Sequence, residues 1–172
     1  MSDLSVLAKC GVVVIGRNEG ERLRTCLTSV VDLARVVYVD SGSADDSVQL
    51  ARTLGAIVVD LDMSRPFSAA RARNAGMAAL LSSFPDVDFV QFVDGDCELH
   101  AGWLDSASRF LDQHDVYAMV CGRLRERYPA RSVYNWLCDI EWDGPPGDIL
   151  SCGGVAMGRI SALLAVGGFN EL

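Results

Sequence analysis

Short apolar runs alternate with amphipathic segments along residues 1–125. The runs are rich in β-branched residues, as in strands buried on both faces of a parallel sheet, and they lie at 11–15, 36–39, 57–60 and 89–93. Between them, apolar residues recur at the 3.6-residue period of a helix, most strongly in the Ala-rich stretch 69–81. This alternation predicts an α/β fold: a Rossmann-like, mostly parallel sheet flanked by helices on both faces.

The connections and the last third of the chain give weaker signals. Apolar positions at 23–34 predict a helix after the first strand, and residues 43–46 resemble the N-terminal cap of the next helix. Residues 128–147 are rich in Trp, Pro and Asp without a sustained period, so we expect an irregular or mobile connection there. The remaining elements are predicted as a helix at 103–111, a strand at 117–121, a strand at 152–157 and a helix at 159–166.

Length and charge limit the choice of partners. A chain of 172 residues, half of them apolar, suits one domain; we expect an α/β half at 1–125 and the incomplete start of a second region at 126–172. The net charge of −8 argues against a nucleic-acid partner, because such binding needs clustered Lys and Arg. Six scattered cysteines, no signal peptide and no long apolar stretch predict a cytoplasmic protein with reduced thiols and no transmembrane segment.

Polar clusters follow three of the predicted strands, at 16–19, 40–43 and 94–96. The carboxyl ends of parallel strands share one edge of a sheet, and ligands bind there. The carboxylates of Asp94 and Asp96 flank a glycine and can converge on one hard cation, Mg²⁺ or Mn²⁺, whose open positions suit diphosphate oxygens. A plain Asp-Gly turn is the alternative, but residues 96–102 do not look like a returning strand.

The turn after the first strand is not a glycine cradle for phosphate. Gly16-Arg-Asn-Glu-Gly20 lacks the G-x-G-x-x-G spacing of a dinucleotide site, and the chain has no P-loop. A nucleotide would therefore be bound by side chains and a metal ion.

Five short motifs, in this order, resemble those of family-2 glycosyltransferases of the GT-A fold. They cover nearly the whole chain and read Val12-Val-Val-Ile-Gly-Arg-Asn-Glu19, Val39-Asp-Ser-Gly-Ser-Ala-Asp45, Ala72-Arg-Asn-Ala-Gly76, Val93-Asp-Gly-Asp96 and Gly167-Gly-Phe169. The resemblance implies transfer of a sugar from a nucleotide-diphosphate donor to an acceptor hydroxyl, with inversion and with Mg²⁺ or Mn²⁺. The acceptor would be a carbohydrate, a lipid or another hydroxyl compound of polysaccharide or glycolipid synthesis, and the full-length protein could associate peripherally with a membrane.

The resemblance also assigns roles to single residues. Arg73, with Arg71 as a second candidate, would face the phosphate or the sugar, and the metal would fall to Asp94 and Asp96. The acceptor would lie near Gly153 and Gly154. Trp142, with Trp136 and Tyr134, either stacks on a sugar ring or anchors its segment to the core. The nucleoside contacts would be Ile15, Arg17, Glu19 and Asp40.

Two alternatives stay open from the sequence. A nucleotidyltransferase also uses acids at strand ends, but it would carry a Gly-rich basic loop that residues 17–20 match poorly. A non-catalytic nucleotide-sugar-binding module is the other, because the family's catalytic base usually follows the Gly-Gly-Phe segment and is expected beyond Leu172. The catalytic base is therefore unassigned, and the chain is expected to be part of a longer domain.

Overall fold

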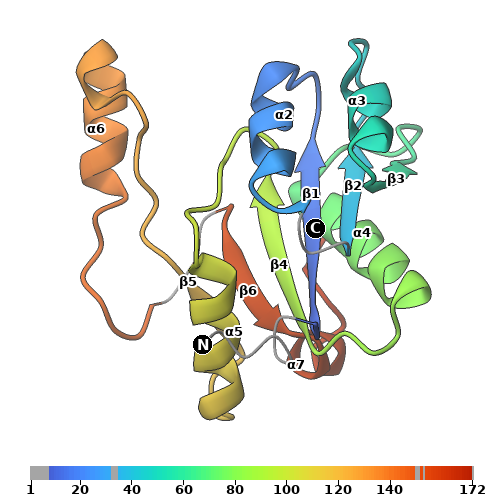
Figure 1. Ribbon diagram of the computed structural model, residues 1–172, viewed down its shortest axis with the longest axis vertical. Coiled ribbons are helices and arrows are strands. Elements are labelled where there is room, and N and C mark those ends of the chain that lie inside the picture. Colours follow the sequence, from blue (N-terminus) through green and yellow to red (C-terminus); the bar gives the residue numbers. More distant parts are fainter. Residues whose placement is uncertain (1–7, 32–34, 150–151, 153, 172) are drawn as a thin grey trace.

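The computed structural model describes residues 8–31, 35–149, 152 and 154–171, and these residues form one six-stranded sheet (Figure 1). In space the strands follow the order β3-β2-β1-β4-β6-β5. Strands β1 to β4 are parallel, whereas β6 is antiparallel to both β4 and β5, so the predicted α/β class with a mostly parallel sheet is confirmed. The bounds are β1 (Cys10–Gly16), β2 (Val36–Asp40), β3 (Ile57–Asp60), β4 (Phe89–Asp94), β5 (Met119–Cys121) and β6 (Ala156–Arg159).

Helices cover both faces of the sheet, as predicted. Val12 and Val14 of β1 face one core cluster, and Val13 and Ile15 face the other, which explains why this strand is apolar throughout. The first cluster includes residues of α2 (Glu21–Thr28), α3 (Ser47–Thr53) and α5 (Trp103–Gln113). The second includes residues of α4 (Ala69–Ser83) and α7 (Ile160–Ala165).

Helix α4 lies unusually close to the sheet. It begins after Ser68, whose hydroxyl caps it by accepting a hydrogen bond from the backbone N of Arg71 at 3.2 Å. At Gly76 an added Cβ atom would stand 2.3 Å from the Val13 side chain and 2.9 Å from that of Val39. The glycine therefore permits a close approach, and this approach brings Arg73 of the same helix to the end of β4.

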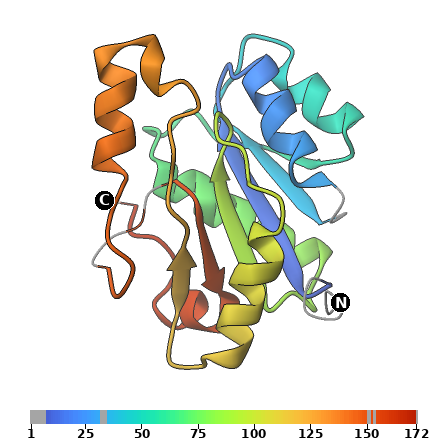
Figure 2. The same cartoon turned by 60° about the vertical axis from the view of Figure 1, so that its left-hand side comes forward.

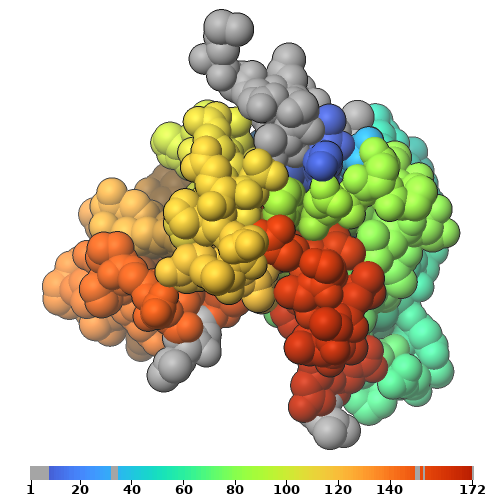
Figure 3. Space-filling model, turned by 90° about the horizontal axis from the view of Figure 1, so that it is seen from below, coloured from blue at the N-terminus to red at the C-terminus, as the bar shows by residue number. Residues whose placement is uncertain are grey.

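Residues 122–149, here called the arm, stand beside the sheet rather than on either face (Figures 1 and 2). The arm contains the 3₁₀ helix η2 (Pro129–Arg131) and α6 (Val133–Glu141), and no residue of α6 is buried. In the view of Figure 3 the orange residues of the arm form a lobe next to α5. No helix in the described part of the chain is both long and apolar enough to cross a membrane.

The prediction of an irregular connection at 128–147 was wrong. Ser132 caps α6 by accepting a hydrogen bond from the backbone N of Asn135 at 3.2 Å. Apolar side chains then recur at 133, 136, 137 and 140, which is the spacing of one helical face. The pattern is short and bounded by Pro and Asp residues, and this is why it passes for irregular structure.

Some predicted boundaries were also wrong. The cap expected at 43–46 falls at the end of that range: α3 begins at Ser47 after Asp46, Oδ1 of Asp45 accepts from the backbone N of Ser47 at 3.0 Å, and the hydroxyl of Ser43 bonds to Asp40 instead. The helix expected at 23–34 ends at Thr28, and residues 32–34 lie outside the described part. The strand expected at 117–121 is reduced to β5, and the one expected at 152–157 is shifted to β6.

Candidate functional site

The register of the parallel strands brings the polar clusters together. Gly16 of β1 is paired with Asp40 of β2, and Ile15 is paired with Asp94 of β4. All three strands therefore end at the same edge of the sheet, as predicted from the clusters that come after them.

A hollow of about 340 Å³ opens at this edge. Its lining includes Ile15, Arg17, Glu19, Asp94 and Asp96, five residues that the resemblance assigns to the donor. Asp40 and Arg73 are not among the lining residues. The full lining is Ile15, Gly16, Arg17, Glu19, Ser41, Phe67, Ala69, Asp94, Gly95 and Asp96.

Asp94 is held by an arginine. Nη2 of Arg73 donates a hydrogen bond to Oδ1 of Asp94 at 3.0 Å. The guanidinium also lies over the ring of Phe169, 5.7 Å from its centroid, and that ring meets Phe92 edge-on. Burial raises the pKa of Asp94, and the charge of Arg73 opposes this shift. Arg73 thus offsets part of the cost of burying this carboxylate.

Glu19 lies across the glycine of the acidic triplet. A Cβ atom on Gly95 would stand 3.2 Å from Cγ of Glu19 and 3.2 Å from the carbonyl oxygen of Ile15, so a side chain here would push both away. One carboxylate oxygen of Glu19 is buried and lies 2.9 Å from Arg22 without a well-directed hydrogen bond. Burial raises the pKa of Glu19, Arg22 lowers it, and the charge of Asp96 raises it further. Glu19 is therefore an acid whose negative charge is poorly compensated.

Asp96 is the most open of the acids in the hollow. Its side chain makes a weak contact with the thiol of Cys97 at 3.6 Å. Within the described residues, no three His, Cys, Asp or Glu side chains are grouped so that they could hold a metal ion by themselves. The hard oxygen atoms of Asp94 and Asp96 nevertheless fit Mg²⁺ or Mn²⁺, because these ions keep positions for ligand oxygens.

Asp40 is placed beneath the hollow, not in it. Its side chain is buried, and Oδ1 accepts hydrogen bonds from the hydroxyls of Tyr38 at 3.0 Å and Ser43 at 2.5 Å. Oδ2 accepts from the backbone N of Gly42 at 3.0 Å and of Ser43 at 2.8 Å. Ser41, the next residue, lines the hollow instead. Direct contact between Asp40 and a nucleoside stays a prediction, and the observed bonds fix the shape of the loop.

Asn18 was missed by sequence reasoning, although it ties the first two loops together. It has a left-handed backbone with φ 55°, a conformation that Asn tolerates better than most residues. Its side-chain oxygen accepts from the backbone N of Ala44 at 2.7 Å, and its own N donates to the hydroxyl of Ser43 at 2.9 Å. The Arg-Asn-Glu sequence in the turn after β1 could have indicated this role of Asn18. Phe67, also in the lining, had no sequence signal.

Arg71, the second candidate for the donor, is buried and engaged elsewhere. Its guanidinium donates to the carbonyl oxygens of Asp62, Arg65 and Pro66 at 2.7, 3.1 and 2.6 Å. These bonds fasten the loop before α4, which carries Phe67 to the hollow. Arg71 therefore contributes to the shape of the site.

The described residues expected on the acceptor side do not lie together in the structure. Gly153 lies outside the described residues. Gly154 stands directly against the donor-side acid, because a Cβ atom on it would lie 1.8 Å from Oδ2 of Asp94. Trp142 follows α6 on the arm and is 38% exposed, and Trp136 and Tyr134 on α6 are also exposed. Both expected roles, stacking on a sugar ring and anchoring the segment, stay predictions.

Comparison with known sequences identifies a family and a relative that the chain matches over part of its length. The signature of the family described as glycosyl transferase family 2 matches residues 11–146. A TPR repeat-containing protein of Synechococcus elongatus is 33% identical over 131 residues, which cover 75% of this chain and 30% of that protein.

Solved structures share the fold. The mannosyltransferase PcManGT of Pyrobaculum calidifontis, in complex with GDP-Man and Mn²⁺, has a TM-score of 0.65 at 21% identity, covering 94% of this chain and 47% of that one. Glucosyl-3-phosphoglycerate synthase of Mycobacterium tuberculosis, with Mn²⁺, UDP-glucose and glycerol 3-phosphate, has a TM-score of 0.61 at 21% identity, covering 90% and 58%. The chain thus has the GT-A fold and spans less than two thirds of each of these proteins.

Proposed function

Because the chain belongs to glycosyl transferase family 2, we propose that it transfers a sugar from a nucleotide-diphosphate donor to an acceptor hydroxyl, with inversion and with Mg²⁺ or Mn²⁺. The proposed acceptor is a carbohydrate, a lipid or another hydroxyl compound of polysaccharide or glycolipid synthesis. Two proteins of the same fold support the donor and the metal, since they were solved with Mn²⁺ and GDP-Man or UDP-glucose.

The observation that carries the proposal is the gathering of Glu19, Asp94 and Asp96 around one hollow. A nucleoside diphosphate is an anion, so three carboxylates would repel it unless a cation stands between them. Burial already raises the pKa of Glu19 and of Asp94, so this environment disfavours their charged forms. We assign the cation to Asp94 and Asp96, with Asp96 as the principal ligand because Arg73 already occupies one oxygen of Asp94.

The proposed chemistry is a direct displacement. The acceptor hydroxyl attacks the anomeric carbon while the bond from that carbon to the diphosphate oxygen breaks, and a general base takes the hydroxyl proton. A cation held by Asp94 and Asp96 would offset the charge that develops on the leaving diphosphate. Arg73 adds a second positive charge beside Asp94, and the loops fixed by Asp40 and Asn18 present Arg17 and Ser41 to the donor.

Glu171 is a poor choice for the base. Its carboxylate accepts a hydrogen bond from Asn74 at 3.0 Å and pairs with Arg65 at 3.4 Å. The bond from Asn74, and then the charge of Arg65, lower the pKa of Glu171. A carboxylate with two partners and a lowered pKa holds a proton weakly, which suits attachment of the chain end to α4 better than proton transfer.

The proposal is tested by titrating the protein with UDP and GDP in Mn²⁺ and in EDTA. We expect binding of one of them to require the metal, and Asp96→Asn to weaken it by roughly 100-fold. Asp148→Asn, at an exposed position of the arm, is the matched control and should bind like the wild type. Equal affinity in EDTA and in Mn²⁺ would contradict the metal site.

Turnover separates the enzyme from a binding module. With the matching sugar nucleotide and Mn²⁺, an NMR assay of the anomeric proton should detect transfer, or slow hydrolysis of the donor, with inverted configuration. Donor binding without any consumption over days would favour the module.

A further inference from the structure

One stretch of the arm, residues 123–131, concentrates positive charge in an acidic protein. Four arginines fall within residues 123–131, while the whole chain has a net charge of −8. Three of them have acidic partners: Arg123 pairs with Asp143 at 3.0 Å, Arg125 with Asp139 at 3.8 Å, and Arg127 with Glu98.

Arg131 is different from the other three. Within the described residues, its exposed guanidinium makes no hydrogen bond and no ion pair. The acid that feels its charge, Glu126, is already bound by the backbone N of Tyr128 and by the side chain of Asn135, both at 2.9 Å. Arg131 therefore offers a free set of N–H donors to a ligand.

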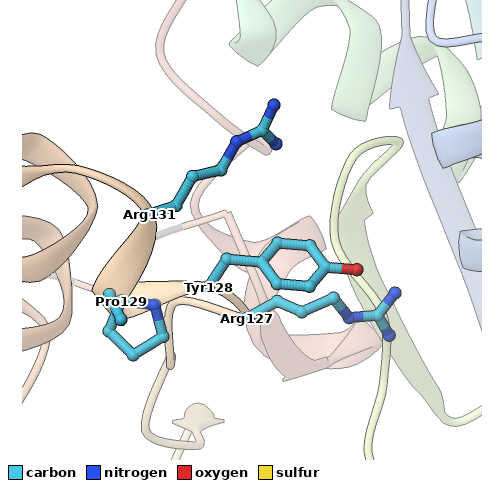
Figure 4. Close-up of a pocket in the computed structure, with 5 residues that line it drawn as sticks. Arg127, Tyr128, Pro129 and Arg131 are labelled. Atoms are coloured by element: carbon cyan, nitrogen blue, oxygen red, sulfur yellow. The ribbon is translucent and has the colours of Figure 1, made fainter.

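A hollow of about 550 Å³ lies against this segment, lined by residues 127–131. Figure 4 shows Arg127 and Tyr128 extending side by side from the segment, with Arg131 rising beyond them on the same side. The hollow thus combines the free guanidinium of Arg131 with a phenol and with the guanidinium of Arg127, which is also paired with Glu98, on a wall formed otherwise by Pro129 and Ala130. Planar guanidinium groups match the oxygens of a phosphate, and a phenol can donate a further hydrogen bond.

An ion pair links this hollow to the segment that carries the donor-side acids. The ion pair between Arg127 and Glu98 joins the arm to the loop after β4, and Glu98 is two residues beyond Asp96. A molecule that is held by Arg131 at one end can therefore extend towards the donor at the other.

We propose that the hollow of Arg127, Tyr128 and Arg131 binds a phosphate group of the acceptor and so orients the acceptor hydroxyl towards the donor sugar. This inference rests on the proposed function. The two anion sites then work by different means: the donor diphosphate needs a cation because carboxylates surround it, whereas the acceptor phosphate is bound by arginines without a metal. The phosphate can belong to a soluble phosphorylated compound or to a lipid headgroup, since α6, with exposed Trp136, begins two residues after Arg131.

The test uses the whole chain in EDTA, where the donor site is expected to be silent. Calorimetric titration with glycerol 3-phosphate, and with glycerol as the uncharged control, measures the soluble source. Co-sedimentation with phosphatidylcholine vesicles, with or without phosphatidic acid, measures the lipid source. We expect binding of the phosphorylated probe in one arm of the experiment or the other, and a loss of about tenfold in Arg131→Gln. Arg131→Lys should retain part of the affinity.

Arg109→Gln is the matched control, because Arg109 is exposed on α5, is paired with Asp105 and does not line the hollow. It should bind like the wild type. Equal binding by wild type and Arg131→Gln, an equal loss in Arg109→Gln, or no preference for the phosphorylated probe from either source would overturn the inference. Nucleotide binding in Mn²⁺, measured in parallel, should be unchanged in Arg131→Gln. If the phosphorylated probe binds as expected but no nucleotide binds, the proposed function is contradicted, whereas the hollow remains a phosphate-binding site.

Discussion

The edge of the sheet and the arm both carry charged and aromatic side chains, but the protein holds them in different ways. At the edge, Asp94 ends a buried strand and is fixed by Arg73 of a helix that packs on the same sheet. On the arm, the contacts are mainly internal, such as the bond from the backbone N of Glu126 to Asp139 at 3.0 Å. The edge is thus part of the core, whereas the arm is largely a surface structure, which meets the rest through Leu124, packed against the core, and through the pair of Arg127 and Glu98.

This difference separates two tasks of the proposed enzyme. Metal and diphosphate chemistry needs acids placed to within a fraction of an ångström, and a buried sheet supplies that placement. Acceptor recognition has to differ between enzymes. Because no residue of α6 is buried, the arm can change in sequence without loss of the fold. Substitutions at the edge should therefore have large effects, and comparable ones on the arm small effects.

The largest contrast should come from two glycines. Gly154→Ala places a Cβ atom 1.8 Å from Oδ2 of Asp94, so the carboxylate or the chain must move. At Gly144 on the arm an added Cβ atom meets nothing within 4 Å. We expect Gly154→Ala to weaken Mn²⁺-dependent nucleotide binding by roughly 100-fold and Gly144→Ala to leave it unchanged in the same titration. Wild-type affinity in Gly154→Ala would mean that Asp94 is less constrained than its contacts imply.

A second contrast concerns buried and exposed aspartates. Asp40→Ala leaves the hydroxyl of buried Tyr38 and the backbone N of Gly42 without their acceptor, so we expect unfolding in urea to become easier by about 2–3 kcal/mol. Asp148→Ala on the arm should change the free energy of unfolding by less than about 0.5 kcal/mol. If Asp40→Ala keeps its stability but loses nucleotide affinity, Asp40 contacts the nucleoside directly.

A third contrast uses two tryptophans. Nε1 of Trp103 donates to Oε1 of buried Gln91 at 2.7 Å, and the ring fills the space beside Gly122. Trp103→Leu should therefore lower the free energy of unfolding by about 2 kcal/mol, from the unpaired amide and the lost packing. Trp136 is 54% exposed on the arm, and Trp136→Leu should change the same free energy by less than about 0.5 kcal/mol. A large loss in Trp136→Leu would show that the arm stabilises the domain.

The same division decides what could be predicted from the sequence. The strands at 11–15 and 89–93 are buried on both faces and therefore almost wholly apolar, so the sheet and its acidic edge were predictable. The position of Asp40 beneath the edge was not, because an aspartate at a strand end looks alike whether it binds a ligand or its own loop. The antiparallel β6 was not predicted either, since strand direction leaves no trace in a four-residue pattern.

The arm was the least predictable part. Helix α6 has an apolar face, but it is exposed and spans only about two turns between Pro and Asp residues, so its periodic signal is short. The contact of Gly154 with Asp94 was also out of reach, because it joins positions 60 residues apart whose side chains give no hint of each other.

The smallest expected effect is a pH-dependent gain of stability when Glu19, an acid at the edge itself, is replaced. Burial raises the pKa of Glu19 above its ordinary value of 4.5, so the folded protein binds a proton there more readily than the unfolded chain does. The charged form therefore opposes folding at neutral pH, and this opposition disappears as the pH falls below about 4.5, where Glu19 is protonated in both states. Without metal, Glu19→Gln should raise the melting temperature at pH 7 by about 2 °C, with the difference from wild type vanishing near about pH 4. Glu21→Gln, at an exposed acid of α2, is the control and should show no such gain. A lower melting temperature in Glu19→Gln at neutral pH would mean that the contact with Arg22 outweighs burial, and the edge would then be stabilised by its acids rather than strained by them.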